Sequence, residues 1–500
     1  MLIETQRLTI RDIQKEDGIR FSKMKQTTKN LKKQVVTGTL VLAMLVTSVG
    51  CTNKSQNEPS DAIKLYSPNR SAEEIVNVGK IKAYADCWQG NPIEEDLSNN
   101  LTLAYSLSVS NVTKFASDKY IPKGYSVNKM IEWGKTPSLG MDILHKNGFT
   151  GKGATIAYVD QPIGTHEQYT RNNLHYTNNT ESESSMHGPA VLSILAGKDI
   201  GVVPDADVYY YAHASWKRDQ STHVQCLNQI MEQNKKLPKE KKITMVGFSD
   251  NINPTEKNAE AFQEAVDACE KAGIMVWFCG DYGRLDFVPL SDKSNPNNVY
   301  AKVLGGYDTN RVFVPTSGVT TAANLYGANY TYWGQGGLSW AMPYVLGIYA
   351  MAKEIDQSLT KDELYQYLLD TSYKVNAISV IHPVAYIAKV LEKVGRKEDA
   401  AKLLEQEKNR NKYIYAVHDL KGSSQEEQQK IYDSCYDVTN ADVVTVDASA
   451  FSNTKEMYDA LCADAKKRGG IVKEIRLYGK ASMITYLDKK SKWPVLHMYE

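Results

Sequence analysis

The chain has 500 residues, which is too long for one small domain and favours two or three. Apolar residues make up 42% and charged residues 23%, as is ordinary for a folded soluble chain. The formal net charge of +1, with no Lys/Arg block and no aromatic RNA-binding stretch, gives no indication of a nucleic-acid partner.

Residues 1–23, MLIETQRLTIRDIQKEDGIRFSK, do not fit the rest of the chain. They resemble the first strand and helix of acetyltransferases of the GNAT family, but the acetyl-CoA-binding part of that fold does not follow. We interpret them as a wrongly chosen start codon or a gene-fusion scar, with Met24 as the true start. An acetyltransferase function is therefore the least favoured alternative.

Residues 24–50 have the pattern of an export signal. Basic residues (Lys25, Lys29, Lys32 and Lys33) precede residues 35–49, an uncharged, mostly apolar stretch shorter than the ~20 residues that span a bilayer. Cys51 and a polar stretch follow. This resembles a bacterial lipoprotein signal, although Ser48 stands where that family prefers Leu or Val. The resemblance implies lipid on Cys51 and anchoring on the extracytoplasmic face of the cell membrane. A plain anchor helix, or the secretory signal of a secreted protein, is the alternative.

The seven cysteines leave the disulfide pattern open. If Cys51 carries a lipid, an even number remains, which permits disulfide bonds, and single buried thiols are the alternative. The remaining residues are Cys87, Cys226, Cys269, Cys279, Cys435 and Cys462. No pair has C-x-x-C spacing and no histidine cluster accompanies them, so we expect no zinc site.

The middle of the chain has the pattern of an α/β protein. Residues 51–125 are polar, and we interpret them as a tether followed by a lead-in or pro-region. In residues 126–395, short apolar runs alternate with helical patterns, which predicts a parallel sheet with helices on both faces. The predicted strands are 154–160, 205–213, 243–249 and 274–280, and the predicted helices are 189–197, 221–234, 259–273, 344–352 and 360–373.

The last hundred residues are expected to form a separate unit. Residues 396–412 are strongly charged, and we interpret them as a solvated linker or helix. Residues 413–500 alternate again and predict a small α/β domain of unknown role. Its predicted strands are 413–419, 442–449, 471–479 and 482–488, and its predicted helices are 423–437 and 454–470.

Three motifs in the 126–395 range suggest chemistry. ATIAYVD ends at Asp160, HGPAVLSILAG begins at His187, and GGLSWAMP contains Ser339. The order Asp, His, Ser is that of subtilisin and differs from the orders in chymotrypsin and in α/β-hydrolases. The chain resembles three sequence blocks of the subtilase family. The stretch HGPAVLSILAGKDIGVVPDADV is similar to the block H-G-[TS]-x-V-x-x-x-I-A-G and to the block G-V-A-P-x-A that follows it. The stretch GLSWAMP is similar to the block G-T-S-x-A-x-P, with Leu338 in place of threonine. The resemblance implies a three-layer α/β fold, with a mostly parallel sheet flanked by helices.

The resemblance also implies a catalytic triad. A serine hydroxyl is a poor nucleophile until an imidazole takes its proton, and His187 would serve Ser339 in this way. Asp160 would fix the imidazole tautomer and stabilise the imidazolium. Gly188 and Gly337 would let backbone and substrate approach closely. Taken singly, each residue has a simpler explanation: Ser339 as a helix cap, His187 as a core histidine and Asp160 as a surface aspartate. The three motifs together favour the triad.

One residue departs from the family pattern. Subtilases supply an oxyanion-hole asparagine in an A-x-G-N motif, and here IMVWFCGDYGR places Asp281 at that position. An amide donates a hydrogen bond to the oxyanion, whereas an ionised carboxylate repels it, and losing one donor costs about 10²–10³ in kcat. Three possibilities stay open. Asp281 is kept protonated by burial, the Ser339 backbone N–H serves alone, or turnover is slow or restricted to particular substrates.

Two further stretches are expected near the cleft. The family has an S-x-G edge that pairs with the substrate backbone, and here Gly247, Phe248 and Ser249 occupy it in altered order. Strand-like pairing with a peptide is still expected. The tyrosines of residues 325–335 either line the cleft or pack as an aromatic loop.

The motifs therefore favour a lipid-anchored, extracytoplasmic serine endopeptidase acting through an acyl-enzyme on Ser339, with a protein or peptide substrate. The alternative is a pseudoprotease of the same fold, which binds peptides or a partner protein and is a weak catalyst because of Asp281. No cofactor is expected. Subtilases often bind calcium, but no loop here has a ligand pattern to which we assign it.

Overall fold

The computed structural model describes residues 63–65, 75–300, 311–375, 378–408, 410–418, 424, 441–451, 454–478 and 496–499. The acetyltransferase-like residues 1–23, the signal segment 24–50 and Cys51 lie outside the described residues. Residues 57–500 form one compact unit. In the described parts of the chain, no helix is both long enough and apolar enough to cross a membrane.

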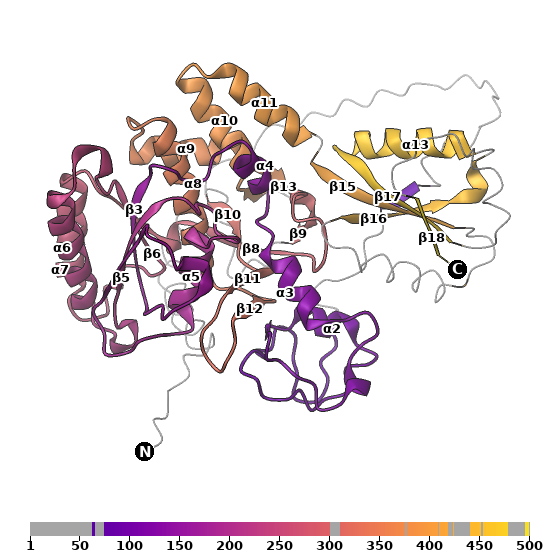
Figure 1. Ribbon diagram of the computed structural model, residues 1–500, viewed down its shortest axis with the longest axis horizontal. Helices are drawn as coiled ribbons and strands as arrows, with labels where there is room; N and C mark the ends of the chain where they lie inside the picture. Colours follow the sequence, from indigo (N-terminus) through magenta and orange to yellow (C-terminus); the bar gives the residue numbers. More distant parts are fainter. Residues whose placement is uncertain are drawn as a thin grey trace, which may run out of the picture. The chain divides into compact units, whose positions relative to one another are not determined.

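A five-stranded, entirely parallel sheet is the main sheet of the 126–395 range (Figure 1). Its strands, in spatial order, are β4 (Leu174–Asn178), β5 (Asp207–Ala212), β3 (Thr155–Asp160), β6 (Met245–Phe248) and β7 (Met275–Phe278). Every residue of β3 and β6 is buried, as is typical of a parallel sheet covered on both faces. The four predicted strands are confirmed, whereas the partly exposed and mostly polar β4 was missed by the apolar pattern.

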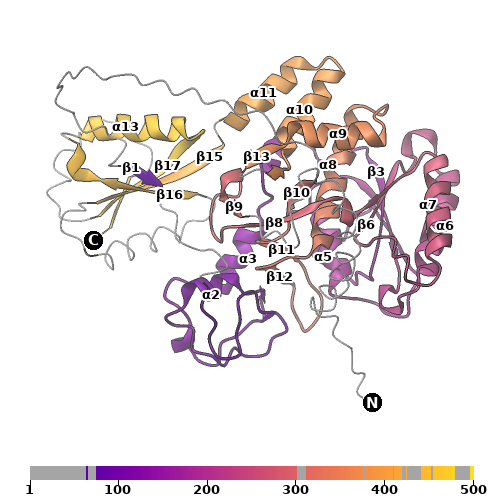
Figure 2. The same ribbon diagram turned by 180° about the vertical axis from the view of Figure 1, so that it is seen from behind.

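Helices cover both faces of this sheet, as predicted, and make three layers. On one face lie α6 (Ser221–Lys236) and α7 (Ala259–Lys271), side by side in Figures 1 and 2. On the other face lie α5 (His187–Ala196) and α8 (Ala341–Ile355). A separate hydrophobic cluster fills the space on each side of the sheet. The protein is therefore a mixed α/β protein whose parallel sheet is flanked by helices.

The strand order makes one edge of this sheet suited to a site. In chain order β3 comes first; β4 and β5 follow and lie on one side of β3, and β6 and β7 then lie on its other side. Ligands bind outside the carboxyl ends of strands at such a reversal of order. Asp160 is the last residue of β3 and lies at this point.

A second, mixed sheet follows, which the sequence did not predict. Its strands, in spatial order, are β13 (Tyr373–Val375), β14 (Ile378–Val380), β10 (Val312–Pro315), β8 (Gly283–Phe287) and β9 (Val299–Tyr300). These strands have two to five residues each, too few for a periodic pattern. Helices α9 (Lys361–Thr371) and α10 (Pro383–Lys393) follow α8, and Thr360 with Glu363 forms a capping box at the start of α9.

Residues 75–125, interpreted as part of a tether and lead-in, are packed against the rest of the protein. They contain α2 (Leu101–Ser106) and β2 (Val109–Ser110), and α3 (Val127–Lys135) and α4 (Met141–Lys146) come next. An antiparallel sheet has the order β11 (Val319–Ala322), β12 (Tyr330–Trp333), β2. Tyr332 and Trp333 of β12 are buried, so the end of the aromatic stretch 325–335 belongs to the core.

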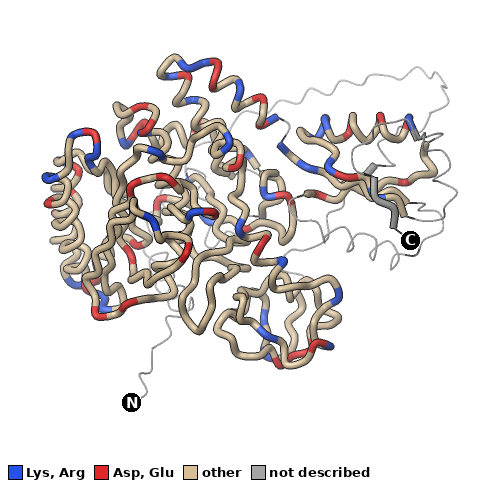
Figure 3. Tube along the Cα trace, in the orientation of Figure 1, with Lys and Arg blue, Asp and Glu red and all other residues tan. Residues whose placement is uncertain are grey.

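The charged range 396–412, interpreted as a solvated linker or helix, contains α11 (Lys397–Lys408). Basic and acidic residues alternate along α11 in Figure 3, as expected for a helix with one face in water. Its other face packs on α10 and α4 through the buried residues Ala400, Leu403 and Glu407. This inner face distinguishes α11 from a free linker.

Residues 411–499 add another sheet. Its strands, in spatial order, are β1 (Ile63–Leu65), β16 (Asp442–Asp447), β15 (Asn411–His418), β17 (Gly470–Tyr478) and β18 (Leu496–Tyr499). Helix α13 (Thr454–Lys467) covers one face over a hydrophobic cluster of its own (Figure 1). On the other face, Ile414 and Val443 belong to the main cluster, so a separate small domain is not confirmed. The predicted strand 482–488, and helix 423–437 apart from residue 424, lie outside the described residues.

Candidate functional site

Asp160 and His187 meet at the carboxyl edge of the main sheet. Asp160 is buried at the end of β3, and His187 is the first residue of α5. Nδ1 of His187 lies 2.6 Å from Oδ1 of Asp160, and the two atoms form a hydrogen bond. The same Oδ1 accepts the backbone N–H of Gln161 at 2.7 Å, which holds the carboxylate in place. Because Asp160 engages Nδ1, the other ring nitrogen, Nε2, is left for proton transfer.

The start of α5 comes very close to the loop after β3. A Cβ at Gly188 would overlap the carbonyl oxygen of Gln161 and lie 2.6 Å from that of Pro162. Ser185 fixes the same junction, because its Oγ donates to the Pro162 carbonyl and accepts the Gly188 N–H, both at 2.9 Å. The close approach expected at Gly188 is confirmed, and it is what lets His187 reach Asp160.

Ser339 lies in the 3₁₀ turn η10 (Leu338–Trp340), which runs directly into α8. Its hydroxyl donates to the carbonyl of Ser249 at 3.3 Å, and the Ser249 hydroxyl donates to the carbonyl of Ser339 at 3.1 Å. Ser249 follows β6, and its Oγ lies 2.6 Å from the hydroxyl of Tyr158. This reciprocal pair ties the Ser339 turn to the carboxyl edge of the sheet.

The His187 ring lies beside the Ser339 turn. Helix α5 packs against η10, and the centroid of the His187 ring is 5.0 Å from that of Trp340, the residue after Ser339. The hydroxyl of Ser339 donates to Ser249 and not to His187 in this arrangement. The three residues predicted from the motifs therefore lie in contacting segments, with the Asp160–His187 bond formed and the His187–Ser339 bond not formed.

The turn before Ser339 depends on Gly336. A Cβ at Gly336 would overlap the carbonyl oxygen of Thr316, whereas the nearest atom to a Cβ at Gly337 would be 3.9 Å away. Among the described residues, the close approach of two backbone segments that we expected at Gly337 is therefore found at Gly336.

The charges near His187 favour its protonated form. Burial by itself lowers the pKa of His187, but the attraction and hydrogen bond of Asp160, with a smaller contribution from Asp250, outweigh burial and raise the pKa above its ordinary value. An imidazolium formed by taking up a serine proton would be stabilised by the same carboxylates.

Two histidines that the motifs did not reveal lie behind Asp160. His213 follows β5 and donates its backbone N–H to the carbonyl of Asp160 at 2.8 Å. Burial, together with the neighbouring His223, lowers the pKa of His213 to about 3, so this ring is neutral at neutral pH. The two ring centroids are 4.2 Å apart, and Nε2 of His223 lies 3.4 Å from Oδ2 of Asp250. The sequence contained one indication that His213 lies near Asp160, because His213 ends the predicted strand 205–213 as Asp160 ends the predicted strand 154–160.

Asp281 lies in the 3₁₀ turn η8 (Cys279–Asp281), which follows β7 and packs against η10. The segment expected to carry the oxyanion hole is thus beside the Ser339 turn. Desolvation of the carboxyl raises the pKa of Asp281 above its ordinary value, although Lys361 and Arg311 counteract this shift. A nearby amide was missed by the motifs: Oδ1 of Asn251 accepts the N–H of Gly280 at 3.0 Å.

The thiols and the metal-ligating side chains of the described residues are arranged as follows. No group of three or more His, Cys, Asp or Glu side chains there is arranged to hold a metal ion. The described cysteines are free thiols, namely Cys87, Cys226, Cys269, Cys279 and Cys462. Burial, with the charge of Asp250, raises the pKa of Cys279 to about 12, so this thiol beside Ser339's turn is not a thiolate nucleophile.

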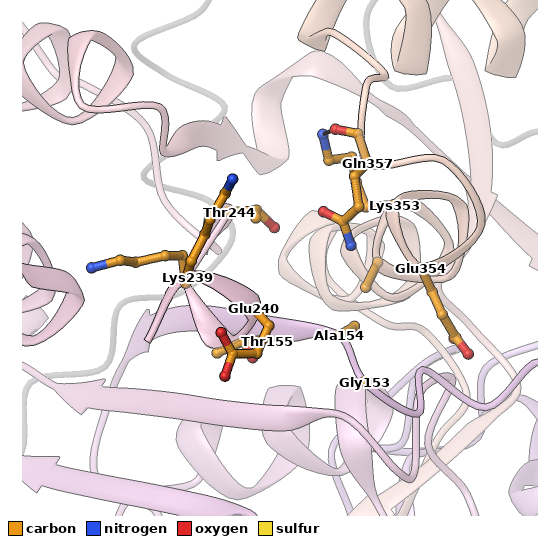
Figure 4. Close-up of a pocket in the computed structure, with 11 residues that line it drawn as sticks. Gly153, Ala154, Thr155, Lys239, Glu240, Thr244, Lys353, Glu354 and Gln357 are labelled. Atoms are coloured by element: carbon orange, nitrogen blue, oxygen red, sulfur yellow. Dashed lines mark hydrogen bonds between the residues drawn. The ribbon is translucent and has the colours of Figure 1, made fainter. Parts of the chain in front are cut away.

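A cavity of about 410 Å³ opens at the amino edge of the same sheet (Figure 4). The start of β3, the segment before β6 and the end of α8 supply its lining, with Lys239, Glu240, Lys353, Glu354 and Gln357 among the residues shown. Asp160, His187, Asp281 and Ser339 are not among its lining residues.

Comparisons with known proteins leave the family open. The sequence matches no protein-family model and no curated protein. Among solved structures, the chain is similar to the subtilase cytotoxin SubAB at 14% identity, over 53% of this chain and 99% of that chain, with a TM-score of 0.41. It is similar to the prenylagaramide maturation protease PagA at 14% identity, over 50% and 98% of the two chains, with a TM-score of 0.39. A cold-adapted subtilisin-like serine proteinase is 17% identical over 46% and 86%, with a TM-score of 0.31. At such low identities and TM-scores, these likenesses carry no argument about activity.

Proposed function

We propose that the protein is a subtilisin-like serine endopeptidase with Ser339 as nucleophile, His187 as general base and Asp160 as the residue that orients His187. The hydrogen bond of 2.6 Å between Asp160 and His187, with the imidazole packed against the residue next to Ser339, is the observation that carries the proposal. Neither a helix cap nor a satisfied core histidine explains why a buried carboxylate, an imidazole and a serine from distant motifs meet at the edge where α/β sheets bind ligands.

The proposed reaction follows from the free ring nitrogen of His187. Rotation about the Cα–Cβ bond of Ser339 transfers its hydroxyl from the Ser249 carbonyl to Nε2 of His187. The serine oxygen then attacks the peptide carbonyl while Nε2 takes its proton, and the imidazolium passes that proton to the leaving amine. Water hydrolyses the acyl-enzyme with His187 as base and restores Ser339.

Hydrolysis of a fluorogenic peptide library tests this function. The wild type is expected to release fluorophore, and the Ser339→Ala variant is expected to lose this activity while unfolding at the same denaturant concentration. Equal activity in both proteins would contradict the proposal.

A pseudoprotease is the second candidate, and two observations favour it. The Ser339 hydroxyl is bonded to a backbone carbonyl, and a carboxylate residue, Asp281, stands in the segment expected to donate to the oxyanion. A fluorophosphonate probe separates the candidates, because only an activated serine reacts with it. Peptide binding without labelling of Ser339 would favour the pseudoprotease.

We also propose lipid anchoring through Cys51, on the basis of the basic and apolar segments before it. Mass spectrometry of the mature N-terminus checks this proposal. The expected result is a lipid-modified Cys51 in the membrane fraction, whereas an unmodified N-terminus in the medium would support secretion.

A further inference from the structure

Aromatic rings form a line from the lead-in segment to His187. The ring centroids of Trp88 and Trp333 are 5.8 Å apart, those of Trp333 and Trp340 are 5.5 Å apart, and those of Trp340 and His187 are 5.0 Å apart. All three indoles are buried, with at most 8% of each residue exposed. Each distance lies in the range in which aromatic pairs attract one another beyond the effect of burial.

The backbone reinforces this line of rings. Trp333 ends β12, which pairs with β2 in the registers Thr331 with Ser110 and Tyr332 with Val109. The next residue, Gly334, abuts the backbone at Ser106, so a side chain there would overlap it. Lead-in residues therefore form both the neighbouring strand and one wall of the turn that leads to Ser339.

Trp340 has little freedom to move at the end of this line. A Cβ at Gly336 would lie only 2.6 Å from Cδ1 of the indole, so the turn contacts the ring directly. Trp333 meets the ring at an interplanar angle of 69°, and the imidazole of His187 lies beside it. Displacing Trp333 would give the Trp340 ring room to turn and would loosen the position of both His187 and Ser339.

We propose that residues 75–125, acting through Trp88, are a permanent positioning element for His187 and Ser339 and are not a pro-region that maturation removes. The catalytic part of this inference rests on the proposed peptidase function. Trp88, Trp333 and Trp340 are positioning residues, because they act through the imidazole and the serine turn.

Removing the Trp88 ring has a specific expected consequence. A cavity beside Trp333 lets the neighbouring rings shift and lets water approach the imidazole. A shifted ring loosens its contact with Asp160, and entering water screens that charge, so the attraction that raises the pKa of His187 is weakened and the pKa falls toward its ordinary value. The groups whose charge acts on His187 are Asp160 and Asp250, and the nearby His213 is neutral; the substitution alters none of the three.

The test compares three variants. Trp88→Ala removes the ring, Trp88→Phe keeps an aromatic ring, and Phe115→Ala is a matched control, since Phe115 lies in the same segment but its ring contacts Tyr125, at 6.1 Å. We expect Trp88→Ala to lower kcat by about 10²-fold with little change in KM, because a small misplacement of catalytic groups has an effect of that size. Trp88→Phe is expected to keep most of the activity, and Phe115→Ala to keep kcat per folded molecule.

The titration of His187 by NMR gives a readout that does not need catalysis. We expect its pKa to fall toward the ordinary value in Trp88→Ala and to stay unchanged in Phe115→Ala. An unchanged titration together with an unchanged kcat per folded molecule in Trp88→Ala would overturn the inference. A fully active mature form whose intact mass lacks residues 75–125 would overturn it as well. If the wild type neither cleaves peptides nor reacts with the probe, the peptidase proposal fails, while the His187 titration still decides whether Trp88 positions the ring.

Discussion

The two edges of the main parallel sheet use polar side chains in different ways. At the carboxyl edge, Asp160 holds His187 and Ser249 holds Ser339, each pair through a direct hydrogen bond between distant segments. At the amino edge there is a cavity of about 410 Å³, and Oε2 of Glu354, which belongs to its lining, has no hydrogen-bond partner in the described structure. A constellation tied together by hydrogen bonds is thus a better guide to chemistry than open volume.

The difference has a cause in the fold. In a parallel sheet every strand ends at the same edge, so the residues that follow β3, β5, β6 and β7 gather there. The helix start at His187 and the turn before α8 point backbone N–H groups toward the same edge, which favours developing negative charge. The amino edge collects helix ends and lysines, and the described residues that line its cavity include no comparable arrangement of acid, base and nucleophile.

The largest expected effect comes from the nucleophile. Ser339→Ala removes the attacking oxygen, and we expect a loss of about 10⁶-fold in kcat, as for other triad serines. Ser358→Ala is the matched control, because Ser358 follows α8 at the amino-edge end and bonds only to Asp356 among the described residues. Peptide hydrolysis assays check both variants. A comparable loss of kcat in Ser339→Ala and Ser358→Ala would contradict the assignment of the chemistry to the carboxyl edge.

Replacing the orienting carboxylate is expected to have the next largest effect. Asp160→Asn keeps the size of the side chain but favours the wrong imidazole tautomer, so we expect kcat to fall by about 10⁴-fold. Asp160 raises the pKa of His187, so the acidic limb of the pH–rate profile should move to lower pH in this variant. A profile that stays in place would show that Asp160 does not act on His187.

The residue expected to complete the oxyanion hole gives an effect in the opposite direction. Asp281→Asn replaces an acceptor by an amide donor, and we expect kcat to increase by up to about 10²–10³-fold above the pKa of His187. The exposed Asp267 of α7 serves as control, as Asp267→Asn. If kcat does not rise, Asp281 is not what limits turnover. A wild-type rate that instead rises on acidification through one carboxyl pKa would indicate that protonated Asp281 donates.

The smallest expected effect belongs to the amino edge. Burial, with the charge of Asp205, raises the pKa of Glu354 to about 7. The folded state therefore binds a proton that the unfolded chain releases above its ordinary pKa of about 4.3, so the free energy of unfolding falls as pH rises from about 4.3 to 7. Glu354→Gln should leave kcat unchanged and stabilise the protein by about 1 kcal/mol at pH 8, since partial exposure screens the charge. Urea unfolding at pH 4 and pH 8 checks the prediction, and equal stability of the two proteins at pH 8 would contradict it.

The sequence predicted the buried part of the fold best. Strand β3 and helix α7 have long, regular patterns, and Gly273 adopts a positive φ of 81° at the end of α7, as a C-cap glycine does. The short strands of the second sheet and the exposed β4 carry no such pattern, because pairing with neighbours and not periodicity defines them.

The candidate site was predicted in part. The motifs single out Asp160, His187 and Ser339 and lead us to expect Ser249 near the cleft, whereas the hydrogen bond from Ser339 to Ser249 and the ring contact of Trp340 with His187 follow from no local pattern. The role of Trp88 could not be foreseen either, because it depends on a contact with Trp333, 245 positions further along the chain, that forms only after folding.

Mass spectrometry after treatment with a fluorophosphonate tests the central claim most directly. Our account predicts one phosphonyl group on Ser339, formed faster as pH rises through the pKa of His187, and greatly slowed in Asp160→Asn. No adduct on Ser339 at any pH, in protein that is folded, would contradict the account.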